Sequence, residues 1–271
     1  MVLDFLCGFG RSCGLNSLNG DKRRLVVAIS AHAMERSEDG DGGPQEEAPA
    51  ASGWGLQWVW GPSKGGLCTQ ALLACVRGSG VQWRGKTLGW LHQAMHGALA
   101  RAGHDAVVTV RSSRDVEDLP LGELWGRLPH SQGQGVRRAL LVGVRYAGQL
   151  QLEGSWNDVE DLKAWLSEDP VDLRILTDAG SSLPTRKNIL AQLRRLLSPC
   201  TGLDQLLLHF SGHGDDAELL PCDWQQAGPI SGQEISELVE DLLPEGATLT
   251  CVFDCCDSSL LLRSLRHQLQ S

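Results

Sequence analysis

In the second half of the chain, short apolar runs alternate with segments whose apolar residues recur every three or four positions. The strand-like runs cover residues 139–147, 172–178, 204–210 and 247–254. The helical segments cover residues 155–168, 185–198 and 230–244, and the last begins with the Ser231/Glu234 pattern of a capping box. Strands that alternate with helices predict a doubly wound α/β sheet, with its functional site at the carboxyl ends of the strands.

The first half carries a similar set of elements in a less regular order. Residues 25–33 read as a strand, and the acidic segment 34–64, rich in Gly, Pro and Ala, predicts a flexible surface loop. Helical spacing covers residues 65–78 and 86–103, and a short strand covers residues 104–113. We interpret residues 1–24 as an N-terminal extension and residues 114–137, which mix charges with Pro, Gly and Gln, as a linker.

The composition narrows the range of partners. With 24 Lys and Arg against 33 Asp and Glu, the net charge is −9 and the isoelectric point is about 5.3. This balance argues against binding to nucleic acid or to a membrane surface. No apolar run reaches the ~18–20 residues of a membrane helix. Nine cysteines without a CxxC pair predict reduced thiols and no metal site. We expect a cytoplasmic monomer.

Two predicted strands run into residues that are suited to nucleophilic catalysis. Strand 204–210 is followed by Gly-His-Gly around His213, and strand 247–254 by Cys255 and Cys256. A thiol nucleophile needs a base and N–H donors for the oxyanion, and the Gly214 N–H can point at a substrate carbonyl. The alternative is that His213 is a turn residue and both cysteines are small buried hydrophobic residues. Position alone leaves both interpretations open.

These residues also resemble the motifs of a known family. "HFSGHG" (209–214) and "FDCCDSS" (253–259) look like the His and Cys motifs of metacaspases. "ALLVGVRYAGQLQLEGSWNDVEDLKAWL" (139–166) and "LLPCDWQQAGPISGQEISELV" (219–239) are similar to two further segments of the family. The resemblance covers Arg138 to about Ser259. It implies a caspase-like, mostly parallel sheet and a cysteine endopeptidase that cleaves after Arg or Lys, with no cofactor in the chemistry.

The resemblance assigns His213 as the base and Cys256 as the nucleophile. The N–H groups of Gly214 and Cys256 would form the oxyanion hole. His213 and Cys256 are 256 − 213 = 43 residues apart, which is close to the ~50 residues between His and Cys in caspases.

The resemblance also implies an acidic S1 pocket, the pocket that receives the residue before the cleaved bond (P1). That pocket falls on Asp158, Ser211 and Asp254, where carboxylates would pair with a guanidinium or an ammonium group. Taken singly, Asp158 would be explained as a helix N-cap and Asp254 as a solvated strand end.

Residues 25–113 resemble the small, p10-like region of the family in "VVAISAHAMERSED", "GGLCTQALLACV" and "AVVTVRSSRD". This order, with p10 before the p20-like region 138–271, is similar to that of type III metacaspases. We therefore expect strand 25–33 to join the sheet and to cover the edge of strand 247–254. The competing explanation is a gene fragment that spans the end of one caspase unit and the start of another.

Two departures from the family pattern affect the expected activity. Asp257 to Ser259 replace His-Ser-Gly after Cys256, and a carboxylate there should raise the pKa of the thiol. The acidic calcium insertion is shortened and Arg263 stands at an Asp position, so we expect little dependence on calcium.

These departures leave alternatives open. A caspase-fold pseudoprotease would bind peptides or partners without cleaving them. A third alternative is a thiol-based metal or redox protein built on Cys222, Cys251, Cys255 and Cys256.

Overall fold

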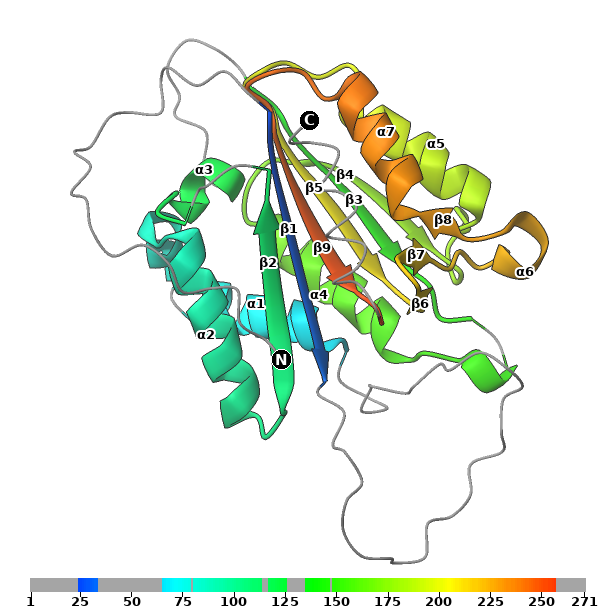
Figure 1. Cartoon of the computed structure of the whole chain (residues 1–271), viewed down its shortest axis with the longest axis horizontal. Helices are drawn as coiled ribbons and strands as arrows, with labels where there is room; N and C mark the ends of the chain where they lie inside the picture. The colour runs from blue at the N-terminus through cyan, green and yellow to red at the C-terminus, as the bar shows by residue number, and fades with distance from the viewer. Residues whose placement is uncertain are drawn as a thin grey trace, which may run out of the picture.

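Six strands form the central sheet of the computed structural model, which describes residues 24–33, 65–78, 80–113, 117–125, 135–146 and 148–256. The strands lie in the order β2-β1-β9-β5-β3-β4 (Figure 1). Their bounds are β1 (Leu25–Ala33), β2 (Ala106–Ser112), β3 (Arg137–Gly143), β4 (Asp172–Thr177), β5 (Gln205–Ser211) and β9 (Thr248–Asp254). Neighbours are parallel except for the antiparallel pair β1 and β2 at one edge.

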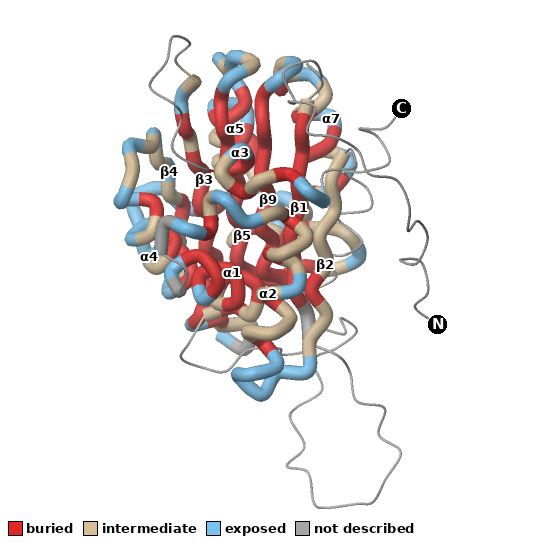
Figure 2. The backbone as a smooth tube through the Cα atoms, turned by 90° about the vertical axis from the view of Figure 1, so that its left-hand side faces the viewer, coloured by how far each residue is buried: buried red, intermediate tan, exposed pale blue. Residues whose placement is uncertain are grey.

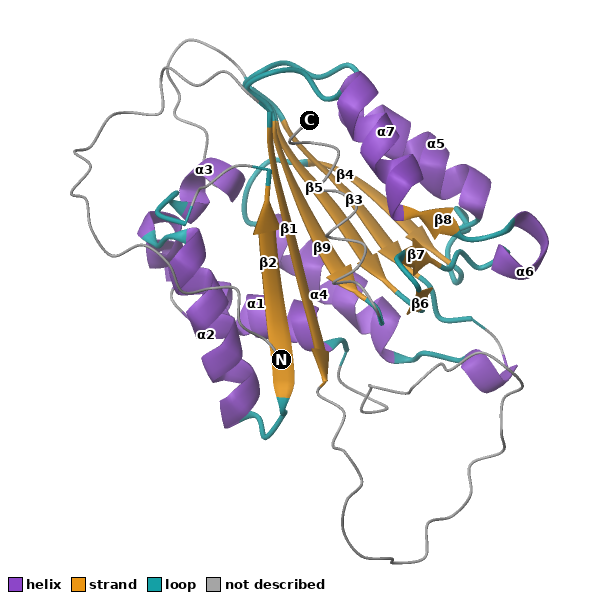
Figure 3. Ribbon diagram, viewed as in Figure 1, coloured by secondary structure: helices purple, strands orange, loops and turns teal. Residues whose placement is uncertain are grey.

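Helices cover both faces of this sheet (Figure 3). One face carries α1 (Leu67–Gly78), α2 (Leu88–Arg101), α3 (Leu121–Trp125) and α4 (Gly154–Leu166). The other face carries α5 (Arg186–Leu197) and α7 (Gly232–Leu242). Smaller elements are the 3₁₀ turns η2 (Gly80–Gly85) and η3 (Gly148–Leu150), helix α6 (Trp224–Ala227), and a small antiparallel sheet of β6 (Gly214–Asp215), β7 (Glu218–Leu219) and β8 (Ile230–Ser231).

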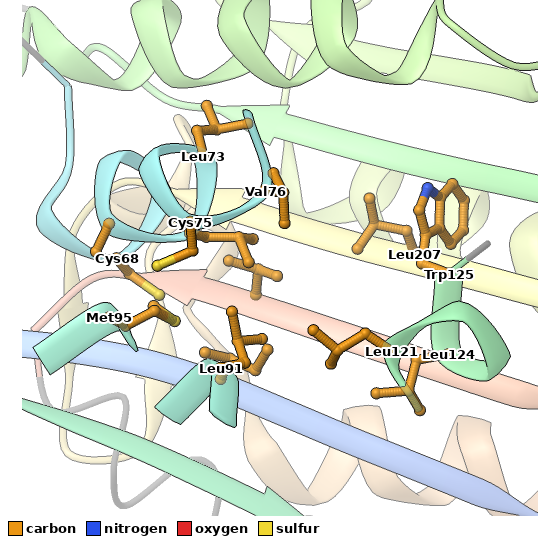
Figure 4. Close-up of a cluster of buried hydrophobic side chains, with 14 of the residues drawn as sticks. Cys68, Leu73, Cys75, Val76, Leu91, Met95, Leu121, Leu124, Trp125 and Leu207 are labelled. Atoms are coloured by element: carbon orange, nitrogen blue, oxygen red, sulfur yellow. The ribbon is translucent and has the colours of Figure 1, made fainter. Parts of the chain in front are cut away.

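Side chains of the central strands alternate between two hydrophobic cores, because successive residues of a strand point to opposite faces. On β5, Leu206 and Leu208 pack on the α5/α7 side and Leu207 on the α1 side. The core on the α1 side includes Cys68 of α1, Met95 of α2 and Trp125 of α3 (Figure 4). Full burial of such a side chain stabilises the fold by about 1.5–3 kcal/mol. The buried residues lie at the centre of the molecule (Figure 2).

The predicted alternation of strands and helices is confirmed, and so is the α/β caspase-like fold. Strand β1 pairs in parallel with β9, from Leu25 opposite Thr248 to Ser30 opposite Phe253. The first half of the chain therefore covers the edge of β9, as expected. The capping box at the start of α7 is present, with Ser231 and Glu234 bonded to each other's backbone N–H groups.

The predicted linker 114–137 contains a short helix that packs into the core. Helix α3 lies within this segment, and its Leu121, Leu124 and Trp125 are buried in the core. Arg137 is already the first residue of β3, and its guanidinium lies 4.7 Å from the Trp125 ring centre. A five-residue helix is too short to show the apolar periodicity that reveals longer ones.

Other expectations fall on residues that the structure does not describe. These are the N-terminal extension up to residue 23, the loop 34–64, and the segment from Asp257 onward. None of the described helices is long and apolar enough to cross a membrane.

Replacing Ile29 with alanine should destabilise the whole sheet. Ile29 is buried on β1 and lies opposite Val252 of β9 and Val110 of β2. The lost methyl groups and the cavity that remains should lower the free energy of unfolding by about 2–5 kcal/mol. Urea denaturation, followed by circular dichroism and tryptophan fluorescence, should show one shared transition. Val136→Ala, at a side chain that is 43% exposed, is the control and should change little. A separate early transition would contradict a single cooperative sheet.

Candidate active site

The candidate base and nucleophile leave the sheet from neighbouring parallel strands (Figure 1). Ser211 at the end of β5 lies opposite Asp254 at the end of β9, and the Gly212 N–H donates to the Asp254 carbonyl at 3.2 Å. His213 and Cys256 each follow this pair by two residues. The sequence therefore delivers both to the same end of the sheet.

Gly214 packs directly against the two cysteines. A Cβ atom at this position would lie 2.6 Å from the Cys256 carbonyl oxygen and 3.0 Å from the Cys255 Sγ. A side chain would force the two strand ends apart, so the close approach requires glycine. The structure thus places Gly214, which follows His213 in the chain, directly against the backbone of Cys256.

His213 is held in a defined orientation and is only 4% exposed. Its Nε2 lies 2.8 Å from the Leu150 carbonyl oxygen, and its backbone N–H donates to the Tyr146 hydroxyl at 2.9 Å. A carbonyl only accepts, so Nε2 carries the hydrogen and Nδ1 of the neutral ring is the basic nitrogen. Burial lowers the pKa of His213, while the Leu150 carbonyl acts in the opposite direction.

The two cysteines differ in burial. Cys255 is 4% exposed and lies in the core on the α5/α7 side with Phe253. Cys256 is half-buried and lies just beyond the end of β9. A nucleophile must be reached by a substrate, and of the two only Cys256 meets this condition. None of the seven described cysteines is joined in a disulfide.

Asp158, Ser211 and Asp254 converge beneath this pair. The Ser211 hydroxyl donates to Asp158 Oδ2 at 2.7 Å, and all three side chains are buried. Asp158 lies inside α4, whose N-cap is Glu153, and Asp254 is 1% exposed. Asp158 is therefore not the N-cap of its own helix, and Asp254 is not a solvated strand end.

The two carboxylates accept hydrogen bonds from the start of α1. The Gly66 N–H donates to both oxygens of Asp158, at 2.8 and 2.9 Å. The N–H groups of Cys68 and Thr69 donate to Asp254, at 3.3 and 2.8 Å. The first N–H groups of a helix have no partner inside the helix, and this end of the helix favours negative charge.

The two buried carboxylates hold a proton more tightly than ordinary carboxylates do. Burial raises the pKa of Asp158 well above its usual value, and the neighbouring Asp254 adds to this effect. Burial also raises the pKa of Asp254 to about 6, although the Thr69 and Cys68 hydrogen bonds oppose it. Two such groups side by side form a site that a cation would stabilise.

Sequence reasoning missed three residues around the site. Tyr146 contacts His213, with ring centres 4.7 Å apart. Asp178 accepts hydrogen bonds from the backbone of Tyr146, and His209 contacts the Thr69 hydroxyl at 3.0 Å. Burial lowers the pKa of His209 to about 3, which keeps its ring neutral. The available signal for Tyr146 was its position, three residues after a buried strand.

No group of three or more His, Cys, Asp or Glu side chains in the described ranges is placed to hold a metal ion. Asp257, Ser258, Ser259 and Arg263, which carry the departures from the family motifs, lie outside these ranges.

Comparison with known proteins identifies the second half of the chain. The family profile "Metacaspase, peptidase C14 domain" matches residues 137–264. Metacaspase-1 of Mycosarcoma maydis is 35% identical over 165 residues, which are 53% of this chain and 41% of that protein. Metacaspase-1 of Schizosaccharomyces pombe is 36% identical over 48% of this chain and 35% of its own length. Metacaspase-1B of Aspergillus fumigatus is 36% identical over 50% and 38%. The matches thus span about two fifths of these relatives.

A mostly parallel sheet, with a histidine and a cysteine leaving neighbouring central strands above two buried acids, defines the caspase-like fold of the C14 cysteine peptidases. Within this class, residues 137–264 belong to the metacaspase family.

The raised pKa of Asp254 predicts a pH-dependent stability. Folding raises this pKa from 3.8 to about 6, so the folded protein binds the proton more tightly than the unfolded chain. The resulting stabilisation is complete below about pH 4 and is lost as the pH rises through about 6.

Relative to Asp254→Asn, which cannot ionise, the wild type should therefore lose stability between pH 4.5 and 7, by at most about 1.4 kcal/mol per pH unit. Urea denaturation at both pH values measures this difference. Asp161→Asn, on the same helix as Asp158, controls for the substitution itself. A wild type that gains stability over Asp254→Asn on going to pH 7 would contradict the assignment.

Proposed function

We propose that this domain is a cysteine endopeptidase that cleaves peptide bonds after Arg or Lys through His213 and Cys256. One observation carries the proposal. The two residues leave adjacent parallel strands two positions beyond the Ser211/Asp254 pair, directly above a pair of buried carboxylates. The family supports a peptidase, and the site supplies the groups that such a reaction needs.

The chemistry is acyl transfer in two steps. His213 Nδ1 takes the thiol proton of Cys256, and the thiolate attacks the substrate carbonyl carbon. The N–H groups of Gly214 and Cys256 bind the resulting oxyanion. When the intermediate collapses, His213 returns its proton to the leaving amine. It then takes a proton from the water that attacks the thioester. When the acid product leaves, His213 returns that proton to the released thiolate, which restores the thiol and the neutral base. No cofactor enters these steps.

Asp158, Ser211 and Asp254 form the proposed S1 pocket. A guanidinium or ammonium group at P1 would be a cationic partner for the two buried carboxylates. Its positive charge would favour their ionised forms. An aspartate at P1 would add a third negative charge to the same site and is excluded. The proposed partner is therefore a peptide or protein with a basic P1 residue, and the domain acts as a cytoplasmic monomer.

A binding protein without peptidase activity is the second candidate. Asp158 already accepts hydrogen bonds from Gly66, Gln70 and Ser211, so a substrate cation must share its oxygens or displace α1. Asp257 next to the thiol favours the same outcome, because a nearby carboxylate disfavours the thiolate. Such a pseudoprotease would bind a basic peptide and leave it intact.

Cleavage of fluorogenic peptides tests the specificity. Peptides with Arg or Lys at P1 should be cleaved, and the matching Asp peptide should not. Asp254→Asn keeps the side-chain size and removes the charge, so kcat/KM for the Arg peptide should fall about 100-fold or more.

Asp161→Asn on α4, a half-exposed acid paired with Arg77, is the matched control and should retain activity. Assays in chelator and in millimolar calcium should give similar rates. Cleavage after Asp would refute the pocket, and binding of the Arg peptide without turnover would favour the pseudoprotease.

Covalent labelling identifies the reactive cysteine. An Arg-chloromethylketone, read by peptide mass mapping, should label Cys256, because Cys255 is buried in the core. Labelling should disappear in Cys256→Ala, persist in Cys255→Ala and slow strongly in His213→Ala. The rate should increase in Asp257→His, which removes a carboxylate next to the thiol. A label that follows Cys255 would overturn the assignment of the nucleophile.

A further inference from the structure

We propose that Tyr146 is a positioning residue for the histidine base, and that Asp178 holds Tyr146 in the conformation this requires. The inference deepens the proposed function, since it rests on His213 being the base. Tyr146 lies in the loop after β3, and it contacts His213 through both its hydroxyl and its ring.

The Tyr146 hydroxyl joins two backbone segments around the site. It accepts a hydrogen bond from the His213 N–H at 2.9 Å and donates one to the Leu220 carbonyl. Leu220 in turn donates its N–H to the His213 carbonyl at 3.1 Å. Both backbone groups of His213 are therefore held, one of them by the phenol.

The same loop also orients the imidazole ring. The Tyr146 ring lies 4.7 Å from the ring of His213, centre to centre, and the planes are inclined by 43°. Leu150, four residues further along, supplies the carbonyl oxygen at His213 Nε2. The ring face and the backbone N–H of His213 thus depend on Tyr146, and its ring nitrogen Nε2 depends on Leu150. A shift of this loop would move Nδ1 relative to the thiol.

Tyr146 adopts a backbone conformation that an aromatic residue rarely takes. Its φ is 60°, in the left-handed region, where a bulky side chain is strained. The Asp178 carboxylate compensates by accepting the N–H groups of Arg145, at 3.0 Å, and of Tyr146, at 2.8 Å. It also accepts the Trp156 indole N–H at 2.7 Å, which ties the loop to α4.

Gly212 makes room for this arrangement. A Cβ atom there would lie 3.0 Å from the Tyr146 hydroxyl and 2.9 Å from the ring of Phe210. Without a side chain at residue 212, the phenol can reach the backbone of the next residue. Burial raises the pKa of the Tyr146 phenol, so it stays protonated and keeps its bond to Leu220.

Steady-state kinetics test the positioning role. Tyr146→Phe keeps the ring and removes the hydroxyl. Because it loosens the base rather than the substrate site, kcat for the Arg-P1 peptide should fall about 10- to 100-fold while KM changes less than about twofold.

Ser155→Ala is the matched control. It also removes a buried hydroxyl that bonds the same loop, at the carbonyls of Val144 and Leu152, but it does not contact His213. Its kcat should stay within about threefold of the wild type. An unchanged kcat in Tyr146→Phe, or an equal loss in Ser155→Ala, would overturn the proposal.

A fluorine label tests the contact without relying on activity. The chain contains one tyrosine, so protein grown with 3-fluorotyrosine carries a single fluorine reporter at residue 146. Its NMR resonance should shift as His213 titrates below pH 6.5, since burial lowers the pKa of that ring. The shift should vanish in His213→Gln.

The two tests fail in distinguishable ways. An inactive wild type whose resonance follows His213 would reject the proposed function and keep the coupling between the two rings. A resonance that titrates identically in His213→Gln would reject the positioning role, whatever the activity.

Discussion

Two buried carboxylates that face one helix N-terminus join the two halves of the molecule. Asp158 comes from α4 and Asp254 from the end of β9, and both accept N–H groups from the start of α1. A pair of like charges removed from water is costly, and the hydrogen bonds of α1 offset part of that cost. The N-terminal N–H groups of α1 would in turn be buried without acceptors if the acids were absent. Each side therefore stabilises the other, and the candidate site rests on both.

The parallel register of β5 and β9 extends this constraint to the candidate dyad. Ser211 and Asp254 lie opposite each other and face α1, so a slip by one residue would turn either of them to the α5/α7 side. His213 and Cys256 follow the same two residues, and Gly214 leaves no room for a looser fit. One register thus sets both the acids and the residues above them.

The sequence was sufficient to predict what depends on local pattern. Continuous apolar runs predicted β3, β5 and β9, and the Ser231/Glu234 pair predicted the start of α7. Contacts between distant segments could not be predicted in this way. The residues around Asp158 in the sequence do not show that its hydrogen-bond partner is Gly66, 92 residues away. The same holds for Asp178 and the backbone of Tyr146, 32 residues apart. The two-residue strands β6, β7 and β8 were missed because two residues carry no periodicity.

Unlike other acids of this chain, Asp158 and Asp254 have no cationic partner among the described residues. The buried Asp204 pairs with Arg138, and the partly buried Asp169 pairs with both Arg84 and Arg137. Among the ion pairs of the described residues, none includes Asp158 or Asp254.

An acid with a purely structural role gains most from a permanent cationic partner, as Asp204 does, because such a partner favours the charged form. Asp158 and Asp254 are instead held by N–H groups and by the Ser211 hydroxyl, which are uncharged donors, and both have raised pKa values. The positively charged side chain of the proposed substrate would supply the cation that the two acids do not receive from the described residues of this chain.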